Sequence, residues 1–282
     1  MSRGLPRGRL TWLLYGLAGV AMALPAWLVA SLVRDGAGLL SWQFLTTESR
    51  PLAAGGGVGA ELFNTLYVVG LALAVSVPVG LGVAVLRREY GWGRRWGPSL
   101  EALADFGAGV PSVVVGFVAF ILLVGALGWP FSRGTGAAAL FLLNVPWMAA
   151  SGMVVLAAVP ESLREASLAL GASSWDTIRR IVLPSAAPGL VQAVTVGAAR
   201  LLGESAALLF TTGVNAAARG WSFWAPGATL AVHVFTVRTE GLMPDATAVS
   251  AATALVLLAM VVALLWLGRA ASRWFMHRSG LA

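Results

Sequence analysis

Two charged side chains stand inside an otherwise apolar stretch of this sequence. Arg200 and Glu204 lie in a segment from about 187 to 212 whose other residues are mostly apolar or small. At about 1.5 Å rise per helical residue, Arg200 lies roughly 20 Å along that segment and Glu204 about 6 Å further. A charge at the centre of a membrane helix costs about 2.5–3.5 kcal/mol, so both side chains must face protein or water.

Two interpretations of this charge pair are open. Spaced four residues apart, Arg200 and Glu204 can pair on one face of a helix and fix its register against neighbouring helices. Alternatively, the Arg200 guanidinium offers a planar fork of donors that suits an oxyanion crossing the membrane, with Glu204 orienting it or controlling access. The two roles are compatible if the pair exchanges partners between two transport states.

A polar stretch from 160 to 184 separates two long apolar segments. Pro160 suits the first turn of a helix, where its missing N–H needs no partner. Gly171 can adopt the left-handed conformation that ends such a helix, and Ser173 with Asp176 has the form of a capping box that begins another. The pattern predicts a helical hairpin, which either packs in the headgroup region or contacts another protein.

Both helices of this hairpin are expected to be amphipathic. Apolar side chains recur at helical spacing on one face of each helix, with arginines on the opposite faces. The apolar set is Leu163, Ala166, Leu170, Trp175, Ile178 and Val182, and the polar set is Arg164, Arg179 and Arg180. Pro184 is expected to end the second helix because it lacks an N–H.

Composition places the chain in a membrane. It is 58% apolar and only 11% charged, against about 25% charged in soluble domains. The net charge of +7 comes from arginines in short segments beside apolar stretches, so we expect no nucleic-acid partner. There is no cysteine, and all 19 basic residues are arginine, which excludes a Walker A loop with its lysine. We expect no metal site, no cofactor and no enzyme activity in this chain.

The apolar segments predict an all-α protein with six membrane-spanning helices. The first segment, about 24 residues long, exceeds the apolar core of a signal peptide and is interpreted as an uncleaved anchor. Residues 1–9 and 271–282 are expected to be tails of one transmembrane domain over 10–270. The expected spans cover about 10–33, 60–86, 104–127, 136–159, 187–212 and 248–267. Within 213–247, residues 220–237 are expected to lie along the membrane interface or to dip part way into it.

The arginines indicate the orientation of these spans. Six spans place both termini on one side, and cytoplasmic segments are enriched in arginine. Thirteen arginines fall on the side of the termini and the 160–184 hairpin, and five on the other. Both termini and the hairpin are therefore expected to be cytoplasmic. His233 and His277 fall outside the expected apolar cores and are expected to be solvated or interfacial.

The hairpin resembles the EAA loop of permease subunits of binding-protein-dependent ABC importers. The resemblance rests on Glu165–Ala166, Gly171 and the run from Ile181 to Pro184, with Ser167 in place of the motif's second alanine. In that family the hairpin is a cytoplasmic coupling helix, here between the fourth and fifth spans, that sits in a cleft of a separate ATPase subunit. The resemblance implies a type I importer permease fold and an ATPase contact through Glu165, Ala166, Gly171, Ile181, Leu183 and Pro184.

The run 198–213, AARLLGESAALLFTTG, is similar to the R-x-x-G-E-[TS]-A segment of phosphate importer permeases, and its second half looks like the A subunit. The chain departs from that family at 151–154, where a Thr-Glu-Glu-like cluster is usual. The resemblance implies that Arg200 and Glu204 belong to the substrate path. It also implies a partner permease, an ATPase dimer that holds ATP and Mg, an extracytoplasmic phosphate-binding protein and the inner cell membrane.

Three classes of function were compared on these residues. An ATP-driven importer accounts for the hairpin, with phosphate favoured and sulfate or molybdate as alternatives. An ion-driven carrier should show broken helices and several intramembrane acids, whereas only Glu204 is expected to lie deep. A membrane enzyme would need a catalytic group, and none stands out. The sequence therefore favours the importer.

Overall fold

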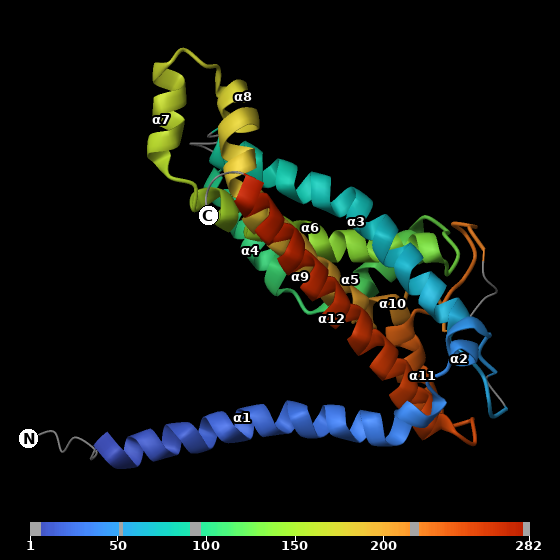
Figure 1. The fold of residues 1–282 in the computed structure, drawn as a ribbon. Coiled ribbons are helices and arrows are strands. Elements are labelled where there is room, and N and C mark those ends of the chain that lie inside the picture. Colours follow the sequence, from blue (N-terminus) through green and yellow to red (C-terminus); the bar gives the residue numbers. More distant parts are fainter. Residues whose placement is uncertain (1–6, 51–52, 91–96, 215–219, 279–282) are drawn as a thin grey trace, which may run out of the picture.

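The computed structural model describes residues 7–50, 53–90, 97–214 and 220–278, and the regular structure within these ranges is helical (Figure 1). Two long helices, α3 (Gly59–Arg88) and α6 (Arg133–Ala157), form the centre. Beside them lie α9 (Leu183–Leu202) and α12 (Ala246–Arg278). The predicted all-α membrane fold is confirmed, because these helices are long and apolar enough to span a membrane.

The pair α3 and α6 is packed through small residues. A Cβ atom added to Gly80 would lie 2.7 Å from the Cβ of Met148, and one added to Gly152 would lie 2.8 Å from the Cβ of Ala84. One turn before these contacts along both helices, the buried Asn144 donates from Nδ2 to Ser76 Oγ at 2.7 Å. Small residues let membrane helices approach closely, and hydrogen bonds between them add to the attraction. The two helices therefore form a rigid unit.

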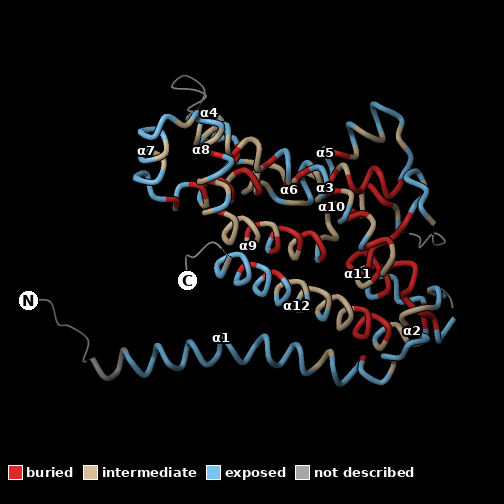
Figure 2. The backbone as a smooth tube through the Cα atoms, turned by 45° about the horizontal axis from the view of Figure 1, so that its top comes forward, coloured by how far each residue is buried: buried red, intermediate tan, exposed pale blue. Residues whose placement is uncertain are grey.

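The first predicted span, α1 (Arg7–Gly36), stands apart from the other helices (Figure 1). None of its most apolar 18-residue window is buried, and it is exposed along most of its length in Figure 2. It meets α12 only near its end, where Gly36 closely approaches the backbone of Ala251 and Ala252. One 3-10 turn, Ala37–Leu39, and the short α2 (Trp42–Thr46) then lead toward α3.

The predicted span over 104–127 is bent rather than continuous. Its two parts, α4 (Gly97–Gly109) and α5 (Ser112–Ala119) with a π turn over Phe120–Ala126, meet at 99°. Pro111 causes the bend, because it cannot continue the helical hydrogen bonding and restricts the residue before it. The described ranges hold five long apolar helices, and the predicted six when this bent pair counts as one span.

The prediction of one helix over 187–212 is wrong. The helix α9 ends at Leu202, residues 203–205 are not helical, and a four-residue helix, α10 (Ala206–Leu209), follows. Gly203 favours helix termination, and the polar side chains after it can bond the freed backbone. The two interrupted segments meet each other, since a Cβ added to Gly116 of α5 would lie 2.5 Å from the Cα of Ala207 in α10.

Between α6 and α9 lies the predicted hairpin, formed by α7 (Glu161–Ala169) and α8 (Ser174–Thr177). The expectation that Pro184 ends its second helix is wrong, because α8 continues through a π turn over Ile178–Val182 into α9. Leu183 N donates to Ile178 O in this wider turn. Pro184 therefore lies in the first turn of α9, where a missing N–H is tolerated.

The segment 213–247 contains a buried helix, α11 (Leu230–Glu240), which packs against α12 and α3.

Opposite α11, the hairpin, the start of α1 and the end of α12 all lie toward the left of Figure 1, which agrees with termini and hairpin on one side of the membrane. Four arginines used for the orientation, Arg3, Arg94, Arg95 and Arg219, lie outside the described residues.

Candidate functional site

The hairpin turn has the predicted backbone chemistry. Gly171 adopts a left-handed conformation with φ of 84°, which a residue with a side chain adopts only at a cost. Ser173 then begins α8, because its Oγ accepts from the backbone N of Asp176 at 3.1 Å and donates to the Asp176 carboxylate at 2.7 Å. These local bonds fix the hairpin at its tip.

The outer surface of the hairpin is largely uncovered by the described residues. Of the residues predicted to contact an ATPase, Glu165, Ala166, Gly171 and Pro184 are exposed, and Ile181 and Leu183 are partly buried. Leu170 at the tip is 90% exposed and Trp175 is 54% exposed. Between the helices lies a notch of about 340 Å³, lined by Ser167, Leu170, Gly171, Ala172, Asp176, Arg180 and Ile181. An exposed tip with apolar side chains and a notch is suited to contact another protein.

The predicted amphipathic faces hold for only part of the hairpin. Ile178 and Val182 are buried as expected, at 2% and 0% exposure. On α7, in contrast, the expected apolar face is exposed, and the side chain of Arg164, placed on the polar face, is only 13% exposed. The reason is that Arg164 has an ionic partner on another element, Glu89 just after α3.

Arg200 and Glu204 do not form the pair that their spacing suggests. The structure has no ion pair between them, and Arg200 makes no hydrogen bond to another described residue. Glu204 instead accepts from the backbone N of Ala207 at 3.2 Å through Oε1. A continuous helix would have placed the two side chains on one face, but the break after Leu202 separates them.

Arg200 and Glu204 each lie at a helix end whose partial charge is opposite to that of the side chain. Arg200 is in the last turn of α9, where the helix dipole is negative, and Glu204 precedes α10, where backbone N–H groups point outward. Interrupted helices with such ends at mid-membrane depth are typical of transport sites, because the freed backbone groups and the charges can face a path.

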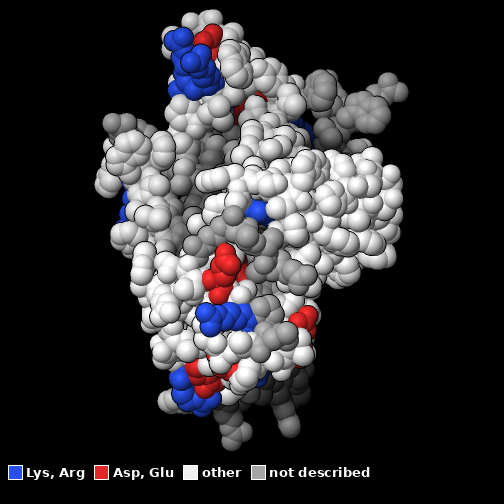
Figure 3. All heavy atoms as spheres, turned by 90° about the vertical axis from the view of Figure 1, so that its right-hand side faces the viewer, with Lys and Arg blue, Asp and Glu red and all other residues white. Residues whose placement is uncertain are grey.

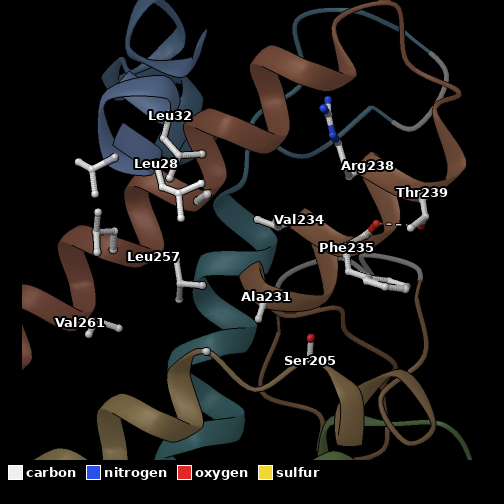
Figure 4. Close-up of a pocket in the computed structure, with 14 residues that line it drawn as sticks. Leu28, Leu32, Ser205, Ala231, Val234, Phe235, Arg238, Thr239, Leu257 and Val261 are labelled. Carbon is white, nitrogen blue, oxygen red and sulfur yellow. Dashed lines mark hydrogen bonds between the residues drawn. The ribbon is translucent and has the colours of Figure 1, made fainter. Parts of the chain in front are cut away.

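An apolar groove opens beside this break (Figure 4). It has a cavity volume of about 670 Å³ and is walled by α1, α11 and α12, with the Ser205 hydroxyl at one end. Its lining includes Leu28, Leu32, Val234, Phe235, Leu257 and Val261. The Arg238 guanidinium points away from the groove, toward Thr247 Oγ1 at 2.8 Å. A wall of this composition suits lipid or another apolar helix rather than an anion.

Sequence reasoning missed a buried acid at the start of α3 and the buried histidine of α11 beside it. Glu61 is fully buried, and its Oε1 lies 3.5 Å from Nδ1 of His233, which is 7% exposed in α11. No described residue forms a hydrogen bond with either carboxylate oxygen of Glu61 or with His233 Nε2. His233 was expected to be solvated or interfacial, and it is buried inside the protein rather than solvated. The pair could have been predicted only from a signal that linked α3 to the segment 213–247, whose structure the sequence left open.

A second missed feature is the buried Arg133 at the start of α6. Its side chain is 1% exposed, lies over the rings of Phe63 and Tyr67 at 5.9 and 5.5 Å, and donates to the carbonyls of Gly220 and Ala225. These contacts fasten the loop before α11 to the end of the molecule opposite the hairpin. That end, seen in Figure 3, is mostly uncharged, with a few acidic and basic groups.

A family model matches this architecture. Residues 76–277 match the family described as "Binding-protein-dependent transport system inner membrane component". The chain belongs to this family. It is thus a multi-pass membrane permease of the ABC importer class and a transport subunit rather than an enzyme. Because broken helices are also a carrier feature, the family match decides between the importer and the carrier.

Curated relatives point the same way. The chain is 33% identical over 272 residues to the probable ABC transporter permease protein YqgI of Bacillus subtilis, covering 90% of this chain and 92% of that protein. It is 39% identical to the phosphate transport system permease protein PstA 1 of Mycobacterium tuberculosis over 66% of this chain and 60% of that one. PstA of Haemophilus influenzae is 31% identical over 74% and 73%. The predicted likeness to phosphate permeases is confirmed.

Solved structures share the fold at low identity. A chain of the inward-facing MetNI methionine ABC transporter matches with a TM-score of 0.61 and 21% identity, covering 78% of this chain and 94% of that one. A chain of a bacterial alginate ABC transporter, solved with an alginate-bound periplasmic protein, matches with a TM-score of 0.62 and 13% identity over 94% and 95%. At such identities the likeness concerns the fold alone.

Proposed function

We propose that this chain is one of two permease subunits of an ATP-driven importer of inorganic phosphate in the inner cell membrane. The observation that carries the proposal is the Arg200 guanidinium, which has no partner in the described chain and stands beside a helix break. A guanidinium matches phosphate oxygens with two parallel donors. The named phosphate permeases among the relatives support phosphate over other oxyanions.

Glu204 has a supporting role in this proposal. Its carboxylate holds the N-terminus of α10 through Ala207 and thereby keeps the break after α9 open. A phosphate that approaches Arg200 would meet a carboxylate nearby, which favours release rather than tight retention. A path must bind its substrate weakly enough for the substrate to leave.

A partner permease would cover the face that this chain leaves open. The unpaired Arg200 cannot face lipid without a large cost, and α1 has no cover along most of its length. A second, similar subunit would shield both and leave a path between the two chains. This chain has no lysine for a Walker A loop, so ATP and Mg would be held by an ATPase dimer.

The hairpin would be the contact to that ATPase. Glu165, Ala166, Gly171, Ile181, Leu183 and Pro184 are the residues proposed for this contact, and the exposed Leu170 beside them supports it. An extracytoplasmic phosphate-binding protein would deliver the substrate at the opposite end of the molecule, where Trp221 is 78% exposed. That end carries the loop that Arg133 fastens.

The test is phosphate uptake by the complex that co-purifies with the tagged chain, reconstituted into liposomes with and without ATP. We expect ATP-dependent uptake of phosphate that excess sulfate or molybdate does not inhibit. Arg200→Ala should lower uptake roughly tenfold or more, since a charge-assisted hydrogen bond contributes about 1.5–3 kcal/mol. Arg200→Lys should lower it less, because it keeps the charge but loses the fork.

Arg273→Ala is the matched control, because it removes one exposed arginine of α12 far from the break. Uptake that survives both Arg200 changes would contradict the role of Arg200. Inhibition by sulfate or molybdate would point to that anion instead of phosphate. Uptake by the chain alone, without the ATPase, would contradict ATP-driven import.

A further inference from the structure

Arg164 at the base of the hairpin uses its whole side chain for contacts within this chain. Its Nε donates to Glu89 Oε2 at 2.9 Å and its Nη2 donates to Glu89 Oε1 at 2.8 Å. Nη2 also donates to Leu156 O at 3.0 Å, and Nη1 donates to Val159 O at 2.8 Å and Glu161 Oε2 at 3.2 Å. A guanidinium has five N–H groups, and there are five acceptors for them here.

These acceptors belong to different elements. Glu89 directly follows α3, and its backbone N donates to Val85 O, so it is fixed to the end of that helix. Leu156 belongs to the last turn of α6, and Val159 lies in the connection that follows this helix. Arg164 itself belongs to α7 of the hairpin. One side chain thus joins three elements.

We call the contact of Arg164 with Glu89 and the carbonyls of Leu156 and Val159 the joint, and it is nearly closed to solvent. The side chains of Arg164 and Glu89 are 13% and 4% exposed. Hydrogen bonding to Glu89 raises the pKa of Arg164, so the guanidinium stays charged at physiological pH. A buried pair with two parallel bonds holds one geometry, whereas an exposed pair does not. The ionic contact between Arg180 and Asp176 in the second half of the hairpin is of the exposed kind, at 3.4 Å with side chains 77% and 44% exposed.

The hairpin is therefore attached to the membrane helices in two ways. Its second helix runs through the π turn into α9 without a break. Its first helix reaches the rigid pair α3 and α6 through the Arg164 joint and the short connection at 158–160. A push on the tip would move α9 directly, but it would move α3 and α6 together only while this joint holds.

We propose that Arg164 is the positioning residue that transmits displacement of the hairpin to α3 and α6, with Glu89 as its essential partner. The proposal rests on the proposed contact of the hairpin with an ATPase. Arg164 touches neither substrate nor nucleotide in it. Loss of the joint would leave the hairpin free to follow the ATPase while the two central helices stay behind.

The functional test is the number of phosphate ions imported per ATP hydrolysed by the reconstituted complex. Arg164→Gln and Glu89→Gln should each lower this ratio at least tenfold while the ATPase subunits still co-purify and hydrolyse ATP. Arg164→Lys should fall in between, because an ammonium has three donors for five acceptors. Arg34→Gln, which removes an exposed ion pair with Asp35 outside the hairpin, is the matched control and should leave the ratio within twofold of the parent.

A second test needs only the purified chain. The sequence has no cysteine, so spin labels at Leu170→Cys and Leu86→Cys report the distance between hairpin tip and the end of α3 without background. We expect a narrow distance distribution that broadens at least twofold in Arg164→Gln and not in Arg34→Gln. This result does not depend on the transported anion or on the ATPase.

Two results would contradict the proposed role of the Arg164–Glu89 contact. An unchanged distance distribution in Arg164→Gln would show that the contact does not hold the hairpin. An unchanged import ratio, or loss of the ATPase from the Arg164→Gln complex, would show that the contact does not transmit motion. If the parent complex imports no phosphate with ATP, the proposed function fails, and the distance measurement still tests the joint.

Discussion

Arg164 and Arg133 lie at opposite ends of α6, and both are largely buried, but their partners differ in kind. Arg164 binds a carboxylate and two carbonyls near the end of α6, whereas Arg133 binds two loop carbonyls and lies over two aromatic rings. A buried ion pair strongly penalises the loss of either member, while carbonyls and rings depend less on charge. We infer that the hairpin end is built to transmit force and the opposite end to hold a loop in place.

Removing each guanidinium tests this difference most strongly. Arg164→Met leaves the Glu89 carboxylate buried without its partner and should cost about 3–5 kcal/mol of stability. Arg133→Met leaves two carbonyls without a donor and should cost about 1–3 kcal/mol. Thermal unfolding of the two purified variants in the same detergent measures both costs. An equal or larger loss for Arg133→Met would contradict the comparison.

Lysine substitutions sharpen the same comparison at smaller cost. Arg133→Lys keeps a cation for the rings and carbonyls and should cost about 1 kcal/mol or less. Arg164→Lys loses the two parallel bonds to Glu89 and should cost about 2 kcal/mol. The ratio of the two losses, again from thermal unfolding, is the quantity of interest. If lysine is tolerated better at position 164, the fork geometry is not what matters there.

The smallest effect is expected at the hairpin tip. Gly171→Ala should cost about 1 kcal/mol, because φ is 84° there while a Cβ would meet nothing within 4 Å. Gly38→Ala is the control, since it also meets nothing but has no positive φ. Hydrogen exchange of the hairpin amides should increase in the first variant alone. Faster exchange throughout α3 and α6 as well would mean that the Gly171 turn and the Arg164–Glu89 contact do not act independently.

Local signals allowed the hairpin tip to be predicted from the sequence. Gly171 and the capping box of Ser173 act within a few residues, so their chemistry is visible in the order of the chain. The position of Arg164 was predicted wrongly, because its partner Glu89 is 75 residues away. The Glu61–His233 pair joins α3 to α11, which lie far apart in the sequence, and was missed for the same reason.

Hydropathy located the apolar segments but not their interruptions. The stretch 187–212 is apolar throughout most of its length, so its average hides the break after Leu202. The interpretation of Arg200 and Glu204 as an ion pair required a continuous helix, and the break after Leu202 removes that condition. Gly203 followed by polar residues was the available sign, because such interruptions in membrane helices mark transport sites.

The central claim, that the hairpin carries the contact to a separate ATPase, is tested most directly by cross-linking. A cysteine introduced at Leu170, which is 90% exposed at the hairpin tip, is compared with one at Trp221, which is 78% exposed at the opposite end. In membranes that contain the whole complex, a short cysteine-to-amine linker should join position 170 to the ATPase subunit and position 221 to no ATPase. No ATPase product at position 170, or an ATPase product at position 221, would contradict the account.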